Sequence, residues 1–207
     1  MTLFSDHLKT HEPLLRQLGV DPAMEASLLE FLEILWEQNK ELNLVSRKMT
    51  VPELIDEHLM DSLIGLPHLP HAKVIADLGT GGGFPAAPLA ICRPETRFLL
   101  FEKSPLKCKY LRKLAQVVPN LKVVGPLAPK SLNGGVDLVI SRAFKPIHVT
   151  LDMTETFRKD GGKYCLFKAR RNKIMEELKL AKLKEEDVKI LALNPVGQAE
   201  ERHLVFL

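Results

Sequence analysis

From Val74 onward, the sequence alternates between short apolar runs and longer segments of helical character. This alternation is typical of an α/β fold, a parallel sheet whose strands are joined by crossover helices. A short connection that includes Asn194 and Gly197 separates the last two predicted strands, so we expect an antiparallel hairpin at the edge of a mostly parallel sheet. The seven predicted strands are residues 74–78, 97–102, 121–124, 136–141, 163–168, 188–193 and 202–206, and the predicted helices are residues 85–92, 105–117, 147–157 and 172–183.

The residues before this alternation have a helical pattern. Leucines recur at three- and four-residue spacing through residues 28–35, with glutamates on the other face. Thr50 and Glu53 have the spacing of a capping box, which predicts the start of a second helix. Two prolines then mark a joint. We therefore expect a helical N-terminal region at residues 1–70 and an α/β domain at residues 71–207.

Charge is unevenly distributed along the chain. Residues 1–66 carry 5 Lys/Arg and 12 Asp/Glu, a net charge of −7, whereas residues 67–207 carry 24 and 14, a net charge of +10. The overall composition, 45% hydrophobic and 27% charged, is that of an average globular protein. An anionic partner is therefore expected to bind the basic part of the chain.

Several classes of protein are disfavoured. No apolar stretch approaches the roughly 20 residues that span a bilayer, and the first ten residues lack the apolar core of a signal peptide. Cys92, Cys108 and Cys165 are odd in number and widely spaced, so neither a disulfide framework nor a metal site is expected. We expect a cytoplasmic protein that contacts no membrane, binds no metal and is a monomer.

A glycine-rich turn follows the first predicted strand. Gly79, Gly81 and Gly83 stand at offsets 0, 2 and 4, and Phe84 occupies offset 5, where a dinucleotide-binding fingerprint requires its third glycine. The dehydrogenase pattern therefore fails. Such glycines still let the backbone turn sharply and approach a ligand at a helix N-terminus. A tight strand-to-helix turn without a ligand remains the alternative.

Two carboxylates indicate the kind of ligand. Asp77, two residues before the first glycine, suits a cationic group such as the amino acid end of a sulfonium cofactor. Glu102 ends the second predicted strand, where a carboxylate can accept hydrogen bonds from both ribose hydroxyls of a nucleoside cofactor. With the spaced glycines, this set looks like the S-adenosylmethionine site of Rossmann-like methyltransferases.

Further motifs make the resemblance more specific. They are Trp36-Glu-Gln-Asn39-Lys40, Asn43-Leu44, His58-x-x-Asp61-Ser62, Ile140-Ser-Arg142-Ala-Phe144 and Glu201-Arg202-His203-Leu-Val205. Together with the glycine-rich turn they resemble, nearly end to end, the bacterial small-subunit ribosomal RNA methyltransferase G family, also called glucose-inhibited division protein B. The resemblance implies methylation of guanine nitrogen 7 in the 530 loop of 16S ribosomal RNA, at guanine 527. The implied cofactor is S-adenosylmethionine, and the implied partner is 16S ribosomal RNA or the small ribosomal subunit.

The resemblance also implies which residues bind the cofactor. The contacts carried over from the family are Gly79, Phe84, Glu102, Leu127, Ala128 and Arg142. Asp77, Thr80, Gly81 and Gly83, from the same turn, complete the expected set. One position departs from the family pattern. An acidic residue that can accept a hydrogen bond from the adenine amino group usually stands where Ala128 falls, so backbone groups would have to replace this contact.

The residues after the fourth predicted strand bear on the methyl acceptor. The segment from Ser141 to Phe144 lacks the Asn/Asp-Pro-Pro-aromatic turn of enzymes that methylate exocyclic amines, and Cys92 lacks the preceding proline common in pyrimidine carbon-5 methyltransferases. Guanine nitrogen 7 carries a lone pair and no proton, so its attack on a sulfonium methyl group needs no general base. Arg142 and Lys168 are the candidate catalytic residues, acting through position and charge.

Basic residues near the carboxyl edge of the predicted sheet are candidates for RNA contacts. They are Arg142, Lys168, Arg170, Arg171 and Arg202. An ordinary solvated surface is the alternative for Arg170 and Arg171. His58 and Asp61, three residues apart on one helix face, have metal-ligand chemistry, but we favour hydrogen bonds that link the helical region to the α/β domain.

Two other functions stay open at this point. The first is a small-molecule methyltransferase in which the N-terminal helices close an apolar pocket. The second is a noncatalytic RNA-binding or assembly factor that retains the fold. Binding of S-adenosylmethionine separates the second from both enzymes.

Overall fold

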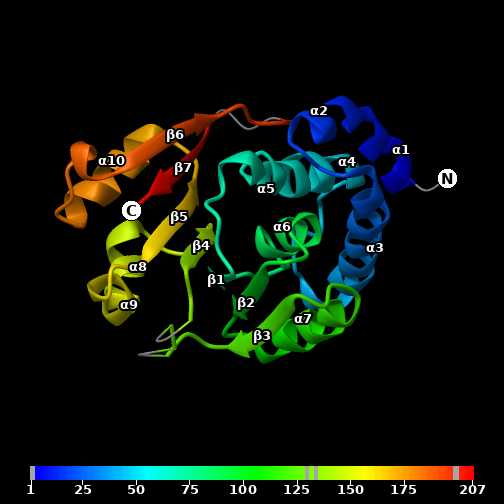
Figure 1. The fold of residues 1–207 in the computed structure, drawn as a ribbon. Coiled ribbons are helices and arrows are strands. Elements are labelled where there is room, and N and C mark those ends of the chain that lie inside the picture. The colour runs from blue at the N-terminus through cyan, green and yellow to red at the C-terminus, as the bar shows by residue number, and fades with distance from the viewer. Residues whose placement is uncertain (1–2, 129–130, 133–134, 198–200) are drawn as a thin grey trace.

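The computed structural model describes residues 3–128, 131–132, 135–197 and 201–207, and these residues form a seven-stranded sheet (Figure 1). The strand order is β3-β2-β1-β4-β5-β7-β6. Strands β1 to β5 pair in parallel, and β7 is antiparallel to both β5 and β6. The strands are β1 (Val74–Leu78), β2 (Arg97–Phe101), β3 (Leu121–Gly125), β4 (Leu138–Arg142), β5 (Lys163–Lys168), β6 (Lys189–Leu193) and β7 (Arg202–Phe206).

These strands confirm the predicted fold class. The bounds of β1, β5 and β7 match the prediction, and the other ends shift by one or two residues. Strand β4 begins two residues later than predicted. The side chain of Asp137 caps the neighbouring strand instead, accepting hydrogen bonds from the amides of Lys73 and Val74, both at 2.8 Å. The antiparallel hairpin is confirmed too, with β6 at the edge and β7 inserted beside β5.

Side chains along the strands alternate between two hydrophobic clusters, one on each face of the sheet. In β1, Ile75 packs with the cluster that includes α6 and α7, whereas Ala76 and Leu78 pack with the cluster of α8 and α10. Figure 1 shows α8 to α10, in yellow to orange, on one side of the sheet and the earlier helices on the other. The five helices are α6 (Ala86–Cys92), α7 (Pro105–Val117), α8 (Ile147–Met153), α9 (Glu155–Lys159) and α10 (Arg171–Leu180).

The N-terminal helices pack on the α6 and α7 side. They are α1 (Leu3–Thr10), α2 (Glu12–Gln17) and α3 (Glu25–Leu42), with a short 3-10 turn (Pro22–Met24) before α3. Leu32 and Leu35 of α3 are fully buried in the same cluster as Leu89 of α6 and Leu111 of α7. The helical spacing seen in the sequence is thereby confirmed, and its apolar face packs against the α/β core.

The helix predicted after Thr50 begins at the predicted capping box but does not keep α-helical winding. In α4 (Val51–Leu54), the Thr50 hydroxyl accepts from the Glu53 amide at 3.3 Å, and the Glu53 carboxylate accepts from the Thr50 amide at 2.7 Å. Residues Ile55–Met60 then form a wider π-helical stretch, which we call the π segment. It leads into α5 (Asp61–Leu63) and a 3-10 turn (Leu66–His68). The π segment carries the groups that reach the candidate site.

The single helix predicted at residues 147–157 is wrong, because the chain breaks at Thr154 between α8 and α9. Buried Thr154 donates a hydrogen bond to the Thr150 carbonyl at 2.7 Å and shares another with the Tyr164 hydroxyl at 2.8 Å. This tertiary contact holds Thr154 at a non-helical φ of −116°.

Among the described residues, no helix combines the length and apolar character needed to cross a membrane.

Candidate functional site: a glycine-rich turn beside a basic cavity

The glycine-rich turn joins β1 to α6 and requires glycine for two reasons. Gly79, Gly81 and Gly83 have φ values of 72°, 58° and 96°, in the left-handed region that other residues rarely adopt. A side chain at Gly79 would also collide with the ring of Phe144. The Gly79 amide donates to the Phe101 carbonyl at 2.8 Å, which fixes the start of the turn against the end of β2.

Glu102 connects the turn to the start of α7. One carboxylate oxygen accepts from the Gly81 amide at 3.2 Å, and the other accepts from the Ser104 amide at 2.8 Å. The Tyr110 hydroxyl, from the next turns of α7, donates to the Gly82 carbonyl at 3.1 Å. Sequence reasoning missed Tyr110, because an aromatic residue on the buried face of a helix gives no functional signal. The structure thus brings Glu102 and the predicted glycines together.

Asp77 is a buried carboxylate at the base of the turn. Its side chain is inaccessible to solvent, and neither its two oxygens nor the Thr80 hydroxyl has a hydrogen-bond partner among the described residues. Burial raises the pKa of Asp77 to about 7. Unsatisfied buried acceptors are costly, so this pair is suited to a polar ligand group that donates hydrogen bonds.

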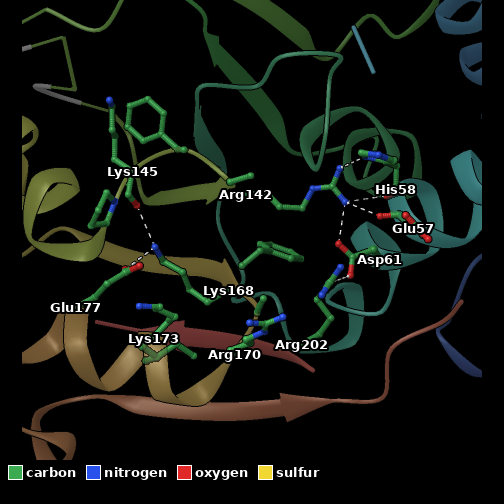
Figure 2. A pocket seen from close by; sticks show the side chains of 16 residues that line it. Glu57, His58, Asp61, Arg142, Lys145, Lys168, Arg170, Lys173, Glu177 and Arg202 are labelled. Atoms are coloured by element: carbon green, nitrogen blue, oxygen red, sulfur yellow. Dashed lines mark hydrogen bonds and ion pairs between the residues drawn. The ribbon is translucent and has the colours of Figure 1, made fainter. Parts of the chain in front are cut away.

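Arg142, at the end of β4, points toward the π segment and α5 (Figure 2). Its guanidinium donates to the Asp61 carboxylate at 2.8 Å and to His58 Nδ1 at 2.7 Å, and it reaches the Glu57 and His58 carbonyls at 3.3 Å. Arg202 of β7 donates to the other oxygen of Asp61. The expectation that His58 and Asp61 link the helical region to the α/β domain is therefore confirmed.

His58 is neutral in this network. Burial is the largest cause that lowers its pKa to about 4, and the positive charges of Arg142 and Arg202 contribute to the same shift. Because Nδ1 accepts from Arg142, the proton of the neutral ring resides on Nε2. The ring of Phe84 packs beside both residues: its centroid is 5.2 Å from that of the His58 ring and 5.1 Å from the Arg142 guanidinium.

A cavity of about 570 Å³ opens next to this network. Figure 2 shows Arg142, Asp61 and Arg202 at one end and Lys168 and Glu177 at the other. Its lining is largely basic and aromatic: Glu57, His58, Asp61, Arg142, Ala143, Phe144, Lys145, Pro146, Phe167, Lys168, Ala169, Arg170, Lys173, Ile174, Glu177 and Arg202. The volume falls in the range of small-ligand sites.

Lys168 is held in place at the far end of the cavity. Its ammonium donates to the Glu177 carboxylate at 2.7 Å and to the Lys145 carbonyl at 3.0 Å. Glu177 also accepts from the Ile147 amide at 2.8 Å, at the start of α8. Sequence reasoning missed Glu177 and Lys145, because the contacts that give them a role come from separate elements.

The other predicted residues lie at different places. Arg170 and Arg202 line the cavity, whereas Arg171 is exposed at the start of α10, where it pairs with Glu185 and its amide donates to Glu201. Leu127 and Ala128 line a second hollow of about 340 Å³, against the junction of α8 and α9. The Ala128 amide donates to the Ser131 hydroxyl at 2.9 Å.

Comparison with known proteins places this arrangement in a family. The sequence model described as rRNA small subunit methyltransferase G matches residues 24–205. The chain belongs to the rRNA small subunit methyltransferase G family. A Bdellovibrio bacteriovorus protein named ribosomal RNA small subunit methyltransferase G 1 is 42% identical, covering 98% of this chain and 100% of that protein. A Methylobacillus flagellatus protein named ribosomal RNA small subunit methyltransferase G is 34% identical, covering 93% and 94%.

Solved structures agree on the fold. A putative O-methyltransferase from Klebsiella pneumoniae aligns with a TM-score of 0.58 at 16% identity, covering 96% of this chain and 94% of that one. Aeropyrum pernix fibrillarin, solved with natively bound S-adenosyl-L-methionine, aligns with a TM-score of 0.53 at 18% identity, covering 72% and 73%. The family resemblance read from the motifs is confirmed. As a member of the methyltransferase G family, the chain is an S-adenosylmethionine-dependent methyltransferase.

Proposed function

We propose that the protein methylates nitrogen 7 of a guanine in the 530 loop of 16S ribosomal RNA, guanine 527, using S-adenosylmethionine. One observation carries the proposal beyond family membership: Phe144 joins the two halves of the site. Its ring lies against Gly79 of the glycine-rich turn, and it also lines the basic cavity. A cofactor on the turn and a base in the cavity would therefore be neighbours.

The residues of the turn fit the cofactor. The unpartnered Asp77 carboxylate and Thr80 hydroxyl would accept from and donate to the amino acid end of the cofactor, and Glu102 would accept from the ribose hydroxyls. Gly79, Gly81 and Gly83 would let the backbone approach, with Phe84 and Arg142 closing the near side. Leu127 and Ala128 are our proposed adenine contacts, through apolar surface and backbone groups.

The bound cofactor would supply an electrophilic sulfonium methyl group. Nitrogen 7 of guanine needs no base to attack such a group, so the protein has only to orient the ring and exclude water. Phe144 and Phe167 line the cavity and would pack on the base. This chemistry suits a site whose ionisable side chains are bound to each other.

We propose that Arg142 and Lys168 act on the base from the two ends of the cavity. An arginine that bound oxygen 6 and nitrogen 7 together would block the nucleophile, so Arg142 should contact oxygen 6 or a phosphate only. Its bonds to Asp61 and His58 support this restriction, because they already orient most of the guanidinium. Lys168, oriented by Glu177, would place its charge near the base or a flanking phosphate.

Arg170, Arg171 and Arg202 are our proposed RNA contacts along the rim of the site. The target guanine must be unpaired to enter the cavity, so we expect loop RNA within the small ribosomal subunit rather than regular duplex. We propose a cytoplasmic monomer. The helical region at residues 1–70 would then hold Arg142 rather than act as a lid.

The test is methyl transfer from labelled S-adenosylmethionine to small ribosomal subunits from cells that lack this protein, with the modified nucleoside identified by mass spectrometry. Label in 7-methylguanosine within the 530 loop is the expected result. Subunits from cells that contain the protein are the matched control and should accept little label. Label on another atom would refute the nitrogen-7 assignment, and cofactor binding without labelled RNA would favour the small-molecule reaction.

A further inference from the structure

Two histidines and an aspartate converge where the first helix meets the π segment. His7, near the end of α1, and His11, just after it, both place Nε2 against the same oxygen of Asp56, at 2.9 and 2.7 Å. All three ligand atoms lie within 4.8 Å of one another. Asp56 is 45 residues from His11 in sequence, so tertiary folding alone assembles the cluster.

The geometry is close to that of a zinc site. Zinc binds histidine nitrogen and carboxylate oxygen at about 2.0–2.2 Å, which in a tetrahedron separates two ligands by about 3.3 Å. The two nitrogen-to-oxygen distances, 2.9 and 2.7 Å, would have to grow by about 0.4 and about 0.6 Å to reach this separation. Spacing of four residues between His7 and His11 places both rings on the same side of the chain, with centroids 5.3 Å apart.

We propose that His7, His11 and Asp56 bind one Zn²⁺ ion, with water completing its coordination. The side chains of His7, His11 and Asp56 are 24%, 16% and 21% exposed, enough for an ion to enter and for water to reach it. Two imidazoles and one carboxylate suit a borderline metal such as zinc. Mg²⁺ prefers an all-oxygen shell in octahedral geometry and would not compete.

The ion would have a structural consequence for the site. Asp56 belongs to the π segment, whose Glu57 and His58 carbonyls accept hydrogen bonds from Arg142. Gly197, before β7, also packs here, because a Cβ at that position would lie 3.1 Å from Cβ of Asp56. Zinc would thus fasten the end of α1 to the segment that orients Arg142. The proposal does not depend on which nucleotide is methylated.

The test is titration of the full chain, without a polyhistidine tag, with Zn²⁺ by calorimetry and with Co²⁺ by visible absorption. We expect one ion per chain, an absorption spectrum of histidine-bound tetrahedral cobalt, and no loss of Zn²⁺ affinity in excess Mg²⁺. His7→Gln and Asp56→Asn should each raise the Kd at least about tenfold. His71→Gln, which removes an exposed histidine elsewhere, should leave the Kd unchanged.

Two results would overturn the proposal. Absence of stoichiometric binding would show that the cluster is held by hydrogen bonds alone, with both imidazoles donating to Asp56. Equal affinity in His7→Gln and the unaltered chain would place the ion at another site. Because His7 is partly exposed near the end of α1, a thermal melt of His7→Gln separates loss of a ligand from loss of folding.

Discussion

Arg142 and Asp61, which are 81 residues apart in sequence, are joined by a hydrogen bond of 2.8 Å between guanidinium and carboxylate. Both side chains are largely buried, 14% and 5% exposed. Arg202 binds the remaining oxygen of Asp61, so one carboxylate connects α5, β4 and β7. The orientation of Arg142 in the candidate site therefore depends on the N-terminal helices.

Replacing Asp61 by asparagine should destabilise the protein strongly. The change leaves two arginines beside a neutral amide, and removing one partner of a buried ion pair costs about 3–5 kcal/mol. Urea unfolding would measure the loss. Glu37→Gln is the matched control, because the Glu37–Lys40 pair is exposed and should contribute less than about 1 kcal/mol. Equal stability of Asp61→Asn and the unaltered chain would show that the pair is dispensable.

Because of His58, the free energy of unfolding should decrease as the pH is lowered. The pKa of this histidine is lowered from 6.5 to about 4 by folding, so between these values the unfolded chain binds more protons than the folded one. This contribution is complete at neutral pH and is lost as the pH falls through that window. His58→Gln lacks it, so from pH 7 to 4 the unaltered chain should lose about 3 kcal/mol relative to the variant. If the unfolding free energies of the unaltered chain and of His58→Gln changed equally between pH 7 and 4, the lowered pKa of His58 would be contradicted.

Asp77 should have the opposite dependence. Its pKa rises from 3.8 to about 7 on folding, so the folded state holds a proton that the unfolded state has released, and stability falls as pH rises through this window. Asp77→Asn should therefore gain up to about 4 kcal/mol over the unaltered chain between pH 4 and 8. The same variant should bind S-adenosylmethionine more weakly. Calorimetry would measure the Kd for S-adenosylmethionine in both proteins, and unfolding curves at pH 4 and 8 would measure their stabilities.

Substitutions at two glycines with similar φ values separate the cost of backbone strain from the cost of a steric collision. Gly79 and Gly19 have φ values of 72° and 79°, but a Cβ collides with Phe144 at Gly79 and meets nothing within 4 Å at Gly19. Gly19→Ala should cost about 1–2 kcal/mol with normal cofactor affinity. Gly79→Ala should cost more and weaken S-adenosylmethionine binding. Similar cofactor affinities in the two variants would argue against the turn as the cofactor site.

Lys168 should affect the RNA step without affecting the cofactor. Lys168→Gln removes the charge beside Glu177 and should lower kcat/KM for small ribosomal subunits by about tenfold or more, since a charged contact contributes about 1.5–3 kcal/mol. The Kd for S-adenosylmethionine should not change. Lys184→Gln, which alters an exposed lysine paired with Glu186, should leave both constants unchanged. A normal kcat/KM in Lys168→Gln would remove that residue from the site.

Most of the fold could be predicted because its signals are local. Alternation in β1 separates Ile75 from Ala76 and Leu78 onto opposite faces, and the capping box marks the start of α4. The break at Thr154 could not be predicted, because the Tyr164 hydroxyl that stabilises it comes from another strand. The π segment has no sequence signal that distinguishes it from a continuing α-helix.

The candidate site divides in the same way. The glycine-rich turn and Glu102 could each be predicted, because each follows an apolar run that reads as a strand. The hydrogen bond from the Gly81 amide to Glu102 was not predicted. The hydrogen-bond partners of the cavity residues could not be predicted from the sequence. Pairing of Lys168 with Glu177 depends on how α10 packs against the sheet, and the convergence of His7 on Asp56 depends on how the first helix meets the π segment.

The position of β7 also bears on how the chain is made. Strand β6 is synthesised before β7, yet it has no neighbour in the sheet until β7 has inserted between it and β5. Arg202, the second partner of Asp61, arrives on that same last strand. During translation the N-terminal helices and the first five strands can fold in order, whereas the edge hairpin and the full Asp61 cluster must wait. The ion pair between Arg202 and Asp61 can therefore form only after residues 202–206 have been synthesised and β7 has paired with β5.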